Sequence, residues 1–275
     1  MTDGTAPRHS YDVRALDEQA ETRRLAAQVE MVEALERPYI EALGLSASST
    51  VIDLGCGPGY MTRTLAGIFP AGRVIGVDVS PSLLAQARER LREHHLPNAA
   101  LLRAWADHLP IASGVANLVY ARFLLQHLAA PIEVLREARR ALRPDGTVVI
   151  VDTDDGGLVV HPEPPGLARL LAASHEAQAR LLGDRHVGRK LRGHLIEAGF
   201  VDVTVEVRSF TSDMVGMDAF LDITLGYKRQ IIPPDLMTPA EVEAVLAEVR
   251  ALDPARGAFA HALGYVARGR APRAG

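Results

Sequence analysis

A short apolar segment that ends in an acid and leads into closely spaced glycines constrains the fold of this chain most. Residues 51–60 read Val-Ile-Asp-Leu-Gly-Cys-Gly-Pro-Gly-Tyr, with glycine at every second position from Gly55 to Gly59. The next apolar run, 74–77, ends at Asp78. Strand, glycine loop, helix, strand and acid in this order are typical of a nucleotide-cofactor site on a parallel sheet. We therefore expect the loop and Asp78 at one edge of such a sheet.

Strand and helix patterns alternate along the first half of the chain. This alternation predicts an α/β fold, with a doubly wound parallel sheet and helices on both faces. The predicted strands are 50–54, 73–77, 99–104, 116–121 and 147–152, the predicted helices are about 59–68, 81–95 and 131–142, and 143–146 is a predicted turn. The pattern is looser elsewhere, with helices expected at 16–43 (broken or kinked at Pro38), 165–182, 187–198, 216–230 and 239–251, and strands at 200–207 and 261–268.

Composition excludes several classes of function. The 275 residues are 48% apolar, which suits one large domain or a domain with a cap. A net charge of −4 and few aromatic residues argue against nucleic acid as a partner. A single cysteine and the absence of an HExxH motif predict neither a disulfide nor a metal site. The sequence has no long uncharged apolar run, so we expect no membrane segment and a cytoplasmic location.

Asp53 is the residue that distinguishes between possible cofactors. It lies two positions before the first glycine, where a carboxylate would repel a diphosphate by roughly 4 kcal/mol at ~4 Å and an effective dielectric constant of about 20. The third glycine also comes one residue earlier than in a dinucleotide fingerprint, where Tyr60 stands instead. These features favour S-adenosylmethionine, which carries an ammonium and a sulfonium and no phosphate. Asp78 suits a ribose contact that NAD and S-adenosylmethionine share.

These segments, together with 74–88 (VIGVDVSPSLLAQAR) and 118–152, resemble the class I S-adenosylmethionine-dependent methyltransferases in their small-molecule (type 11) branch. The resemblance covers about residues 50–152 and extends more weakly through 21–28 and 188–200. It implies a Rossmann-like, seven-stranded, mostly parallel sheet whose last strand is antiparallel. The expected organisation is an N-terminal helical lid over 1–45 and a methyltransferase domain over 46–275, with inserted helical cap segments at about 156–190 and 212–255.

The resemblance also implies roles for individual residues around the cofactor. The methionine end would be held by Asp53 and by the loop residues Gly55, Cys56, Gly57 and Gly59, the ribose by Asp78, and the adenine by Val79, while Arg122 would line the methyl side. Where the family usually reads Gly-Asp-Ala-x-x-Leu-Pro, residues 104–110 read Ala-Trp-Ala-Asp-His-Leu-Pro. Asp107 could replace the missing acid and Ala106 could offer its backbone N–H, while Trp105 packs against the adenine or belongs to the core.

The N-terminal segment offers a second set of candidate contacts. In the resembling branch it folds over the cofactor as a lid, so Tyr11 and Gln28 are expected near the cofactor. Arg24 and Gln28 are four residues apart and share a helix face, from which they could reach the cofactor's carboxylate and amine. The alternatives are a solvated amphipathic helix or a helix that packs on a second subunit in a homodimer.

Methyl transfer needs precise positioning, and it needs a base when the acceptor starts protonated. His127 follows the strand 116–121 at the ligand edge of the sheet, so it is the candidate base or orienting residue; the alternative is a histidine satisfied within the fold. His186 is expected on the surface of a loop. Asp152, Asp154 and Asp155 follow the fifth strand and are expected to be solvated, although one of them could face the substrate.

The sequence therefore predicts methyl transfer from S-adenosylmethionine to the O, N or C atom of a small hydrophobic or aromatic molecule, such as a secondary metabolite. The hydrophobic character is inferred from apolar residues of the expected cap: Leu158, Val159, Val160, Leu167, Leu170, Phe210, Met214, Met217, Phe220 and Leu221. A cyclase or binding protein that retains the cofactor without transferring methyl is the alternative. An NAD-dependent oxidoreductase is disfavoured by Asp53.

Overall fold

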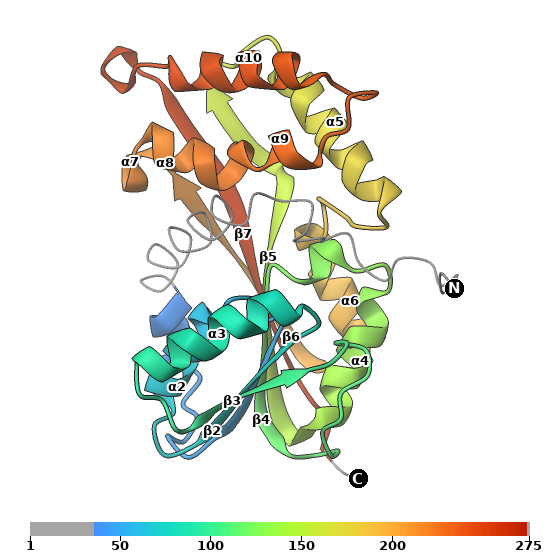
Figure 1. Cartoon of the computed structure of the whole chain (residues 1–275). Helices are drawn as coiled ribbons and strands as arrows, with labels where there is room; N and C mark the ends of the chain where they lie inside the picture. The colour runs from blue at the N-terminus through green and yellow to red at the C-terminus, as the bar shows by residue number, and fades with distance from the viewer. Residues whose placement is uncertain (1–35, 274–275) are drawn as a thin grey trace, which may run out of the picture.

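The computed structural model describes residues 36–273, in which one continuous seven-stranded sheet runs through two lobes (Figure 1). The strand order is β3-β2-β1-β4-β5-β7-β6. The strands β1 to β5 are parallel to their neighbours among themselves, and β7 is antiparallel to both β5 and β6. The predicted Rossmann-like fold is confirmed. The strand bounds are β1 Thr50–Leu54, β2 Arg73–Asp78, β3 Ala99–Arg103, β4 Ala116–Arg122, β5 Leu142–His161, β6 Val201–Thr211 and β7 Phe259–Arg270.

The lower lobe is the part of the fold that the alternating pattern predicted. Successive residues of a strand point to opposite faces, so Val51 packs towards α2 (Tyr60–Ile68) while Ile52 packs towards α4 (Pro131–Ala141) and α6 (Leu191–Glu197). The helix α3 (Pro81–Glu93) packs beside α2 and against β3. It begins as the sequence predicts, because Ser80 caps it by accepting from the Leu83 N–H at 3.4 Å. Because these helices cover the two faces of the sheet, a ligand is expected at the carboxyl ends of the strands.

The upper lobe is built on the C-terminal halves of β5 and β6 and on the N-terminal half of β7, which extend beyond the lower lobe (Figure 1). β5 pairs with β7 from Thr147 opposite Arg270 to His161 opposite Phe259, with a register shift between Asp154 and Val159. A separate hydrophobic core fills this lobe. Its helices are α5 Leu167–Arg180, α7 Ser212–Val215, α8 Met217–Leu221, α9 Lys228–Ile231 and α10 Pro239–Arg250, with short helical turns η4 Asp222–Gly226 and η5 Pro254–Arg256. The turn η3 Gly188–Lys190 leads into α6, and the residues on either side of it, Val187 and Leu191, pack into the core of the lower lobe.

Three details of the predicted elements are wrong. β5 extends nine residues past Asp152, through acids and glycines that are weak strand formers, because β7 supplies the pairing partner. The predicted turn at 143–146 lies within β5 as an irregularity: Ala116 pairs with Leu142 but Leu118 pairs with Thr147. The single helix predicted at 216–230 is divided into α8, the π-helical turn η4 and α9.

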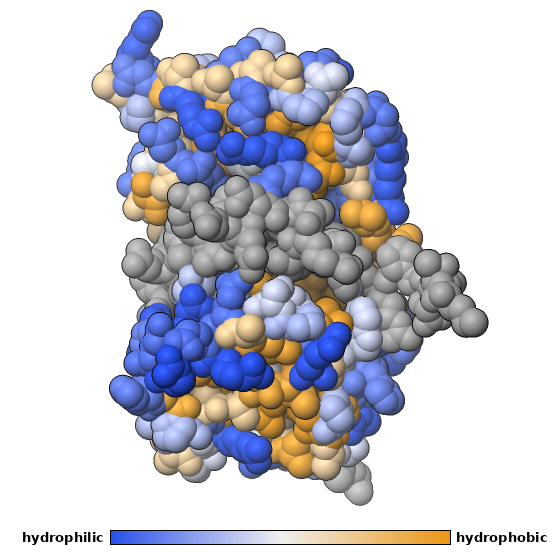
Figure 2. All heavy atoms as spheres, viewed as in Figure 1, coloured by the Kyte–Doolittle hydropathy of each residue, from blue (hydrophilic) through white to orange (hydrophobic). Residues whose placement is uncertain are grey.

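The described part of the chain begins with a helical segment. Residues 36–41 are helical and include Pro38, where the sequence predicted a break. On the face seen in Figure 2, hydrophilic side chains cover much of both lobes, and apolar side chains are visible among the hydrophilic ones on each lobe. Among residues 36–273, none of the helices has the length and apolarity that a membrane span requires.

Candidate functional site

The glycine loop joins β1 to α2 at the carboxyl edge of the sheet. Gly55, Gly57 and Gly59 all adopt positive φ, at +67°, +52° and +80°, which glycine tolerates far better than other residues. A Cβ on Gly59 would lie 2.7 Å from the Cβ of Ala87, so this glycine also permits the close approach of α2 and α3. A Cβ on Gly57 would meet nothing within 4 Å. The loop is therefore closely packed at its helical end and open at its centre.

Asp53 lies beneath this loop with only 2% of its surface exposed. Its Oδ2 accepts a hydrogen bond of 2.6 Å from the Oγ1 of Thr62. Burial raises the pKa of Asp53 to about 7, and the neutral Thr62 hydroxyl offsets this only in part. A cation bound beside this carboxyl would favour its ionised form. The chemistry of the site thus fits a positively charged ligand group.

Asp78 connects the glycine loop to the end of β2. Its Oδ2 accepts from the Gly57 N–H at 2.9 Å, and its Oδ1 accepts from the Ser80 N–H at 2.8 Å. A carboxylate has about four lone-pair sites and can accept several hydrogen bonds, and a contact of Asp78 with the ribose hydroxyls stays a prediction. The Val79 carbonyl accepts from Arg103 Nε at 3.3 Å, which orders the backbone beside this site. Cys56 is buried, and burial raises the pKa of its thiol well above the usual value.

The segment after β3 lies next to the end of β2, because the Ala104 N–H donates to the Asp78 carbonyl at 3.1 Å. Trp105 is 40% exposed, so it does not belong to the core, and a contact with adenine stays a prediction. Asp107 is also exposed, whereas Ala106 is partly buried against the main core. The adenine contacts of Ala106 and Asp107 stay predictions.

Arg122 ends β4 and faces a buried acid. Its Nε lies 3.2 Å from Glu36 Oε1, and Tyr120 donates a hydrogen bond to the same carboxyl. Burial raises the pKa of Glu36 and of Tyr120. Arg122 thus forms an ion pair with Glu36, a partner that the sequence did not indicate. The predicted contacts of Tyr11, Arg24 and Gln28 lie outside the described residues.

His127 belongs to a short 3₁₀ turn, η2 (Leu125–His127), directly after β4. The turn is tied to β5, because the Gln126 N–H donates to Asp152 Oδ2 at 3.2 Å. His127 is half-buried at the carboxyl edge of the sheet. A role in catalysis remains a prediction.

The three acids that the sequence placed after the fifth strand lie within β5 and are not solvated, contrary to expectation: Asp152, Asp154 and Asp155 are at most 6% exposed. The fold supplies partners that are distant in sequence. Arg189 Nε and one terminal nitrogen bond the two oxygens of Asp154 at 2.6 and 2.7 Å, and the pKa of Asp154 is lowered to about 2 because its hydrogen bonds outweigh its burial. Asp152 accepts from the backbone N–H groups of Gln126 and Thr153, and burial raises its pKa to about 7.

Asp155 forms the centre of what we call the junction cluster, made of Asp155, Arg185, Lys228, Ser174 and Gln126. Arg185 donates two bonds to Asp155, at 2.6 and 3.0 Å, and Lys228 Nζ donates at 2.7 Å. Lys228 also donates to Ser174, and Arg185 also donates to Gln126. The neighbouring cations hold the pKa of Asp155 well below its usual range despite burial. The cluster joins β5 to η2, α5 and α9, so it links the two lobes.

One signal in the sequence could have indicated this cluster. Lys228 is one of only two lysines in the chain, and it stands in a segment otherwise predicted to be an ordinary amphipathic helix. In the structure its side chain is fully buried. A buried lysine requires an anionic partner, but nothing in the sequence identifies Asp155 as that partner.

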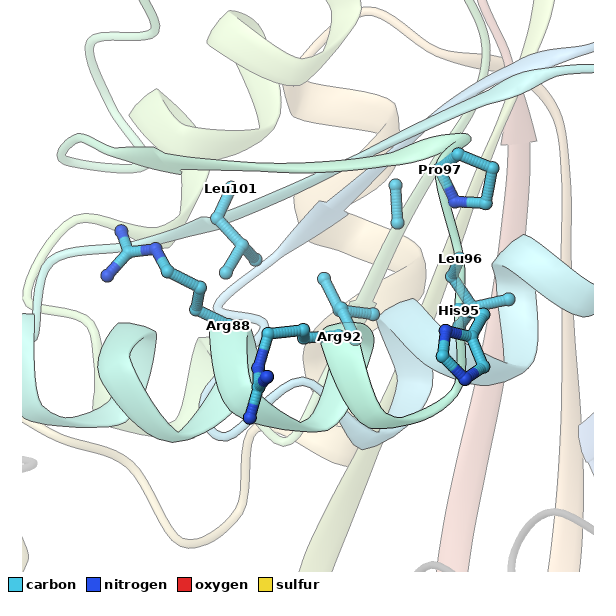
Figure 3. Close-up of a pocket in the computed structure, with 8 residues that line it drawn as sticks. Arg88, Arg92, His95, Leu96, Pro97 and Leu101 are labelled. Atoms are coloured by element: carbon cyan, nitrogen blue, oxygen red, sulfur yellow. The ribbon is translucent and has the colours of Figure 1, made fainter.

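A shallow groove of about 630 Å³ lies away from this edge, on the outer side of α3 and the edge strand β3 (Figure 3). It is lined by the end of α3 and the start of β3, including Arg88, Arg92, His95, Leu96 and Leu101. These residues belong to the amino edge of the sheet, opposite the glycine loop. The groove is therefore not part of the candidate active site.

Comparison with known proteins finds a methyltransferase domain in the part of the chain that contains the glycine loop. Residues 51–146 match the family model described as "Methyltransferase domain". An uncharacterized 37.1 kDa protein in transposon TN4556 of Streptomyces fradiae is 32% identical over 70% of this chain and 55% of its own length. A trans-aconitate 2-methyltransferase of Azoarcus sp. is 38% identical over 42% of this chain and 43% of its own length. The chain spans about half the length of these curated relatives.

Solved structures share the fold. The YcgJ protein from Bacillus subtilis has a TM-score of 0.60 at 18% identity, over 86% of this chain and 97% of its own. The [4+2]-cyclase SpnF has a TM-score of 0.58 at 18% identity, over 98% of this chain and 89% of its own. The chain thus shares the fold of these solved structures, and its residues 51–146 match a methyltransferase domain.

Proposed function

We propose that this protein transfers the methyl group of S-adenosylmethionine to the O, N or C atom of a small metabolite. The observation that carries the proposal is Asp53, a buried carboxyl that forms no ion pair within residues 36–273 and accepts from the neutral Thr62. It lies beneath an open glycine loop, so it suits the positive methionine end of the cofactor. A cytoplasmic location, a role in secondary metabolism and a homodimer through the N-terminal helices stay predictions.

The acceptor needs a different argument from the one that the sequence suggested. Most of the apolar residues taken to predict a hydrophobic pocket pack into the core of the upper lobe, including Leu170, Phe220 and Leu221, which are fully buried. Val159 and Met214 are exposed. A hydrophobic or aromatic acceptor therefore stays a prediction without support from these side chains. The side chains of the junction cluster are polar or charged. They favour an acceptor whose reacting group is also polar.

Calorimetry with S-adenosylmethionine and with its demethylated product tests the cofactor half of the proposal. We expect both to bind, and we expect Asp53→Asn to weaken S-adenosylmethionine by at least about tenfold, or roughly 1.4 kcal/mol. The matched control is Asp152→Asn, because Asp152 is equally buried and has a similarly raised pKa but lies outside the glycine loop. Failure of the wild-type protein to bind either molecule would contradict the proposal.

Transfer of a labelled methyl group into a metabolite extract tests the catalytic half. Labelled product supports methyl transfer. Tight cofactor binding without any labelled product favours the alternative, a cyclase or binding protein that keeps the cofactor. A response to NADH would favour an oxidoreductase, against which the carboxyl of Asp53 argues.

A further inference from the structure

Two histidines lie in edge-to-face contact at the junction between the lobes. The ring centroids of His175, on α5, and His186, before η3, are 4.5 Å apart with an interplanar angle of 72°. Each lies beside its own acid: His186 Nδ1 is 3.1 Å from Asp154 Oδ1, and His175 Nε2 is 3.4 Å from Asp155 Oδ2. Both side chains are partly exposed, at 36% for His186 and 28% for His175. A small molecule could therefore reach both rings.

The partner of His186 determines which ring nitrogen carries the hydrogen. Asp154 accepts from Arg189, from the Gly156 N–H and from the Arg189 N–H, and these bonds lower its pKa to about 2. It is thus a carboxylate that only accepts hydrogen bonds. A hydrogen bond with His186 requires a hydrogen on Nδ1, which leaves the lone pair on Nε2. Among residues 36–273, this Nε2 has no hydrogen-bond partner and is not a buried polar atom.

The loop that carries His186 is fixed at the ligand edge of the sheet. The His186 N–H donates to Asp184 Oδ1 at 2.9 Å, and the Asp184 N–H donates to the Gln126 carbonyl of η2 at 2.8 Å. Asp154 lies three residues beyond Val151, which pairs with Arg122 at the end of β4. At ~3.3 Å per residue, Asp154 is about 10 Å past the level at which β4 ends. This offset places Asp154 beyond the level of the strand end, on the side from which an acceptor would approach a cofactor held at the glycine loop.

The surroundings of His175 suit a general base less well than those of His186. The carboxylate beside it, Asp155, already accepts from Arg185 and Lys228, and the 3.4 Å contact is too poorly aligned to be a hydrogen bond. Its Nε2 is also buried. His175 therefore packs against the ring of His186. The charged and titratable groups that face His186 are Asp154, Asp184, His175 and, through Asp154, Arg189.

We propose that His186, oriented by Asp154, is the general base that takes the proton of a hydroxyl or amine acceptor. The inference rests on the proposed function and names its substrate class, a protic acceptor. As the acceptor oxygen or nitrogen bonds to the methyl carbon, the bond from that carbon to the donor sulfur breaks and its electron pair stays on sulfur. The acceptor's proton passes to Nε2 of His186 and then to solvent. The geometry matches the carboxylate–imidazole pairs that hold a catalytic histidine in one tautomer.

His186→Gln in the full chain is the direct test, with His161→Gln as the matched control because His161 is an exposed histidine at the far end of the same strand β5. We expect transfer of labelled methyl to a hydroxyl or amine acceptor to fall 10²- to 10⁴-fold in His186→Gln, as general-base removal predicts. We expect cofactor affinity by calorimetry and the melting temperature to stay close to those of the wild type. His186→Gly should recover activity when imidazole is added.

Nitrogen-15 NMR of histidine-labelled protein provides a readout that does not depend on turnover. We expect His186 to show hydrogen on Nδ1, and we expect Asp154→Asn to change this tautomer. A resonance that reports hydrogen on Nε2 in the wild type would overturn the inference, as would a His186→Gln enzyme within threefold of wild-type activity. If the wild type methylates only carbon or carboxylate acceptors, the inference fails and the proposed function stands; if it transfers no methyl at all, both fail.

Discussion

Two groups of acids at the same edge of the sheet differ in how the protein satisfies them. Beneath the glycine loop, Asp53 and Asp78 accept from neutral donors, a threonine hydroxyl and backbone N–H groups. Within β5, Asp154 and Asp155 accept from arginine and lysine. The carboxyl of Asp53 forms no ion pair within residues 36–273, while those of Asp154 and Asp155 are already neutralised by cations of the protein. The glycine loop is therefore suited to bind a cofactor, and the junction cluster is suited to hold the lobes together.

Removing the central acid of the junction cluster would be the strongest way to break this comparison. Asp155→Ala leaves Arg185 and Lys228 buried without their anion, and breaking a buried pair costs about 3–5 kcal/mol. We expect a loss of that size in the free energy of unfolding, measured by urea denaturation. Asp235→Asn is the control, because it removes an exposed partner of Arg180 and should change stability very little. A stability loss in Asp155→Ala no larger than in this control would show that the cluster does not hold the lobes.

The pH dependence of stability separates the two groups of acids by sign. Folding raises the pKa of Asp53 from 3.8 to about 7, so below pH 3.8 the acid is protonated in both states. Between pH 4 and 7 the unfolded chain loses this proton first, and stability falls by up to roughly 4 kcal/mol at about 1.4 kcal/mol per pKa unit. Asp154 acts in the opposite sense, because its contribution is present above pH 3.8 and is lost as the pH falls towards 2.

Asp53→Asn should therefore flatten the stability curve between pH 4 and 7 and leave the cofactor-free protein more stable than the wild type near pH 8. Urea denaturation across this pH range measures the effect. Asp152, whose pKa is also about 7, should keep its own share of the slope in this variant. An Asp53→Asn curve that is parallel to the wild-type curve would mean that Asp53 is already ionised in the folded protein.

The glycine loop itself offers the smallest and most local test. Gly59→Ala and Gly57→Ala both place a side chain at positive φ, which costs roughly 1–2 kcal/mol. Only Gly59→Ala also meets Ala87, with the two Cβ atoms 2.7 Å apart, and such overpacking typically costs about 1–3 kcal/mol more. We expect Gly59→Ala to be the less stable variant by thermal denaturation. Equal stabilities would show that α2 and α3 move apart freely and that the loop is not held by packing.

Much of the lower lobe could be predicted because its signals are local. Alternating apolar runs, the Ser80-Pro81 helix start and the glycines at 55, 57 and 59 each act through near neighbours, so they place the loop and Asp78 correctly. The upper lobe was less predictable because its strands depend on partners that are distant in sequence, as in the pairing of Val160 with Ala260, 100 residues away. The same reason explains why Asp154 and Asp155 looked solvated: their partners Arg189, Arg185 and Lys228 are remote in sequence.

By itself, the sequence determined the class of fold and the sign of charge that the glycine loop accepts, because Asp53 and the glycines lie within a few residues of one another and of β1. Only the tertiary structure decided which acids are paired with cations of the protein and which histidine is hydrogen-bonded to a carboxylate. That distinction depends on how β5, α5 and α9 bring distant cations and imidazoles together at one edge of the sheet. A buried charge must be paired wherever the fold places it, and its partner comes from packing rather than from neighbouring sequence.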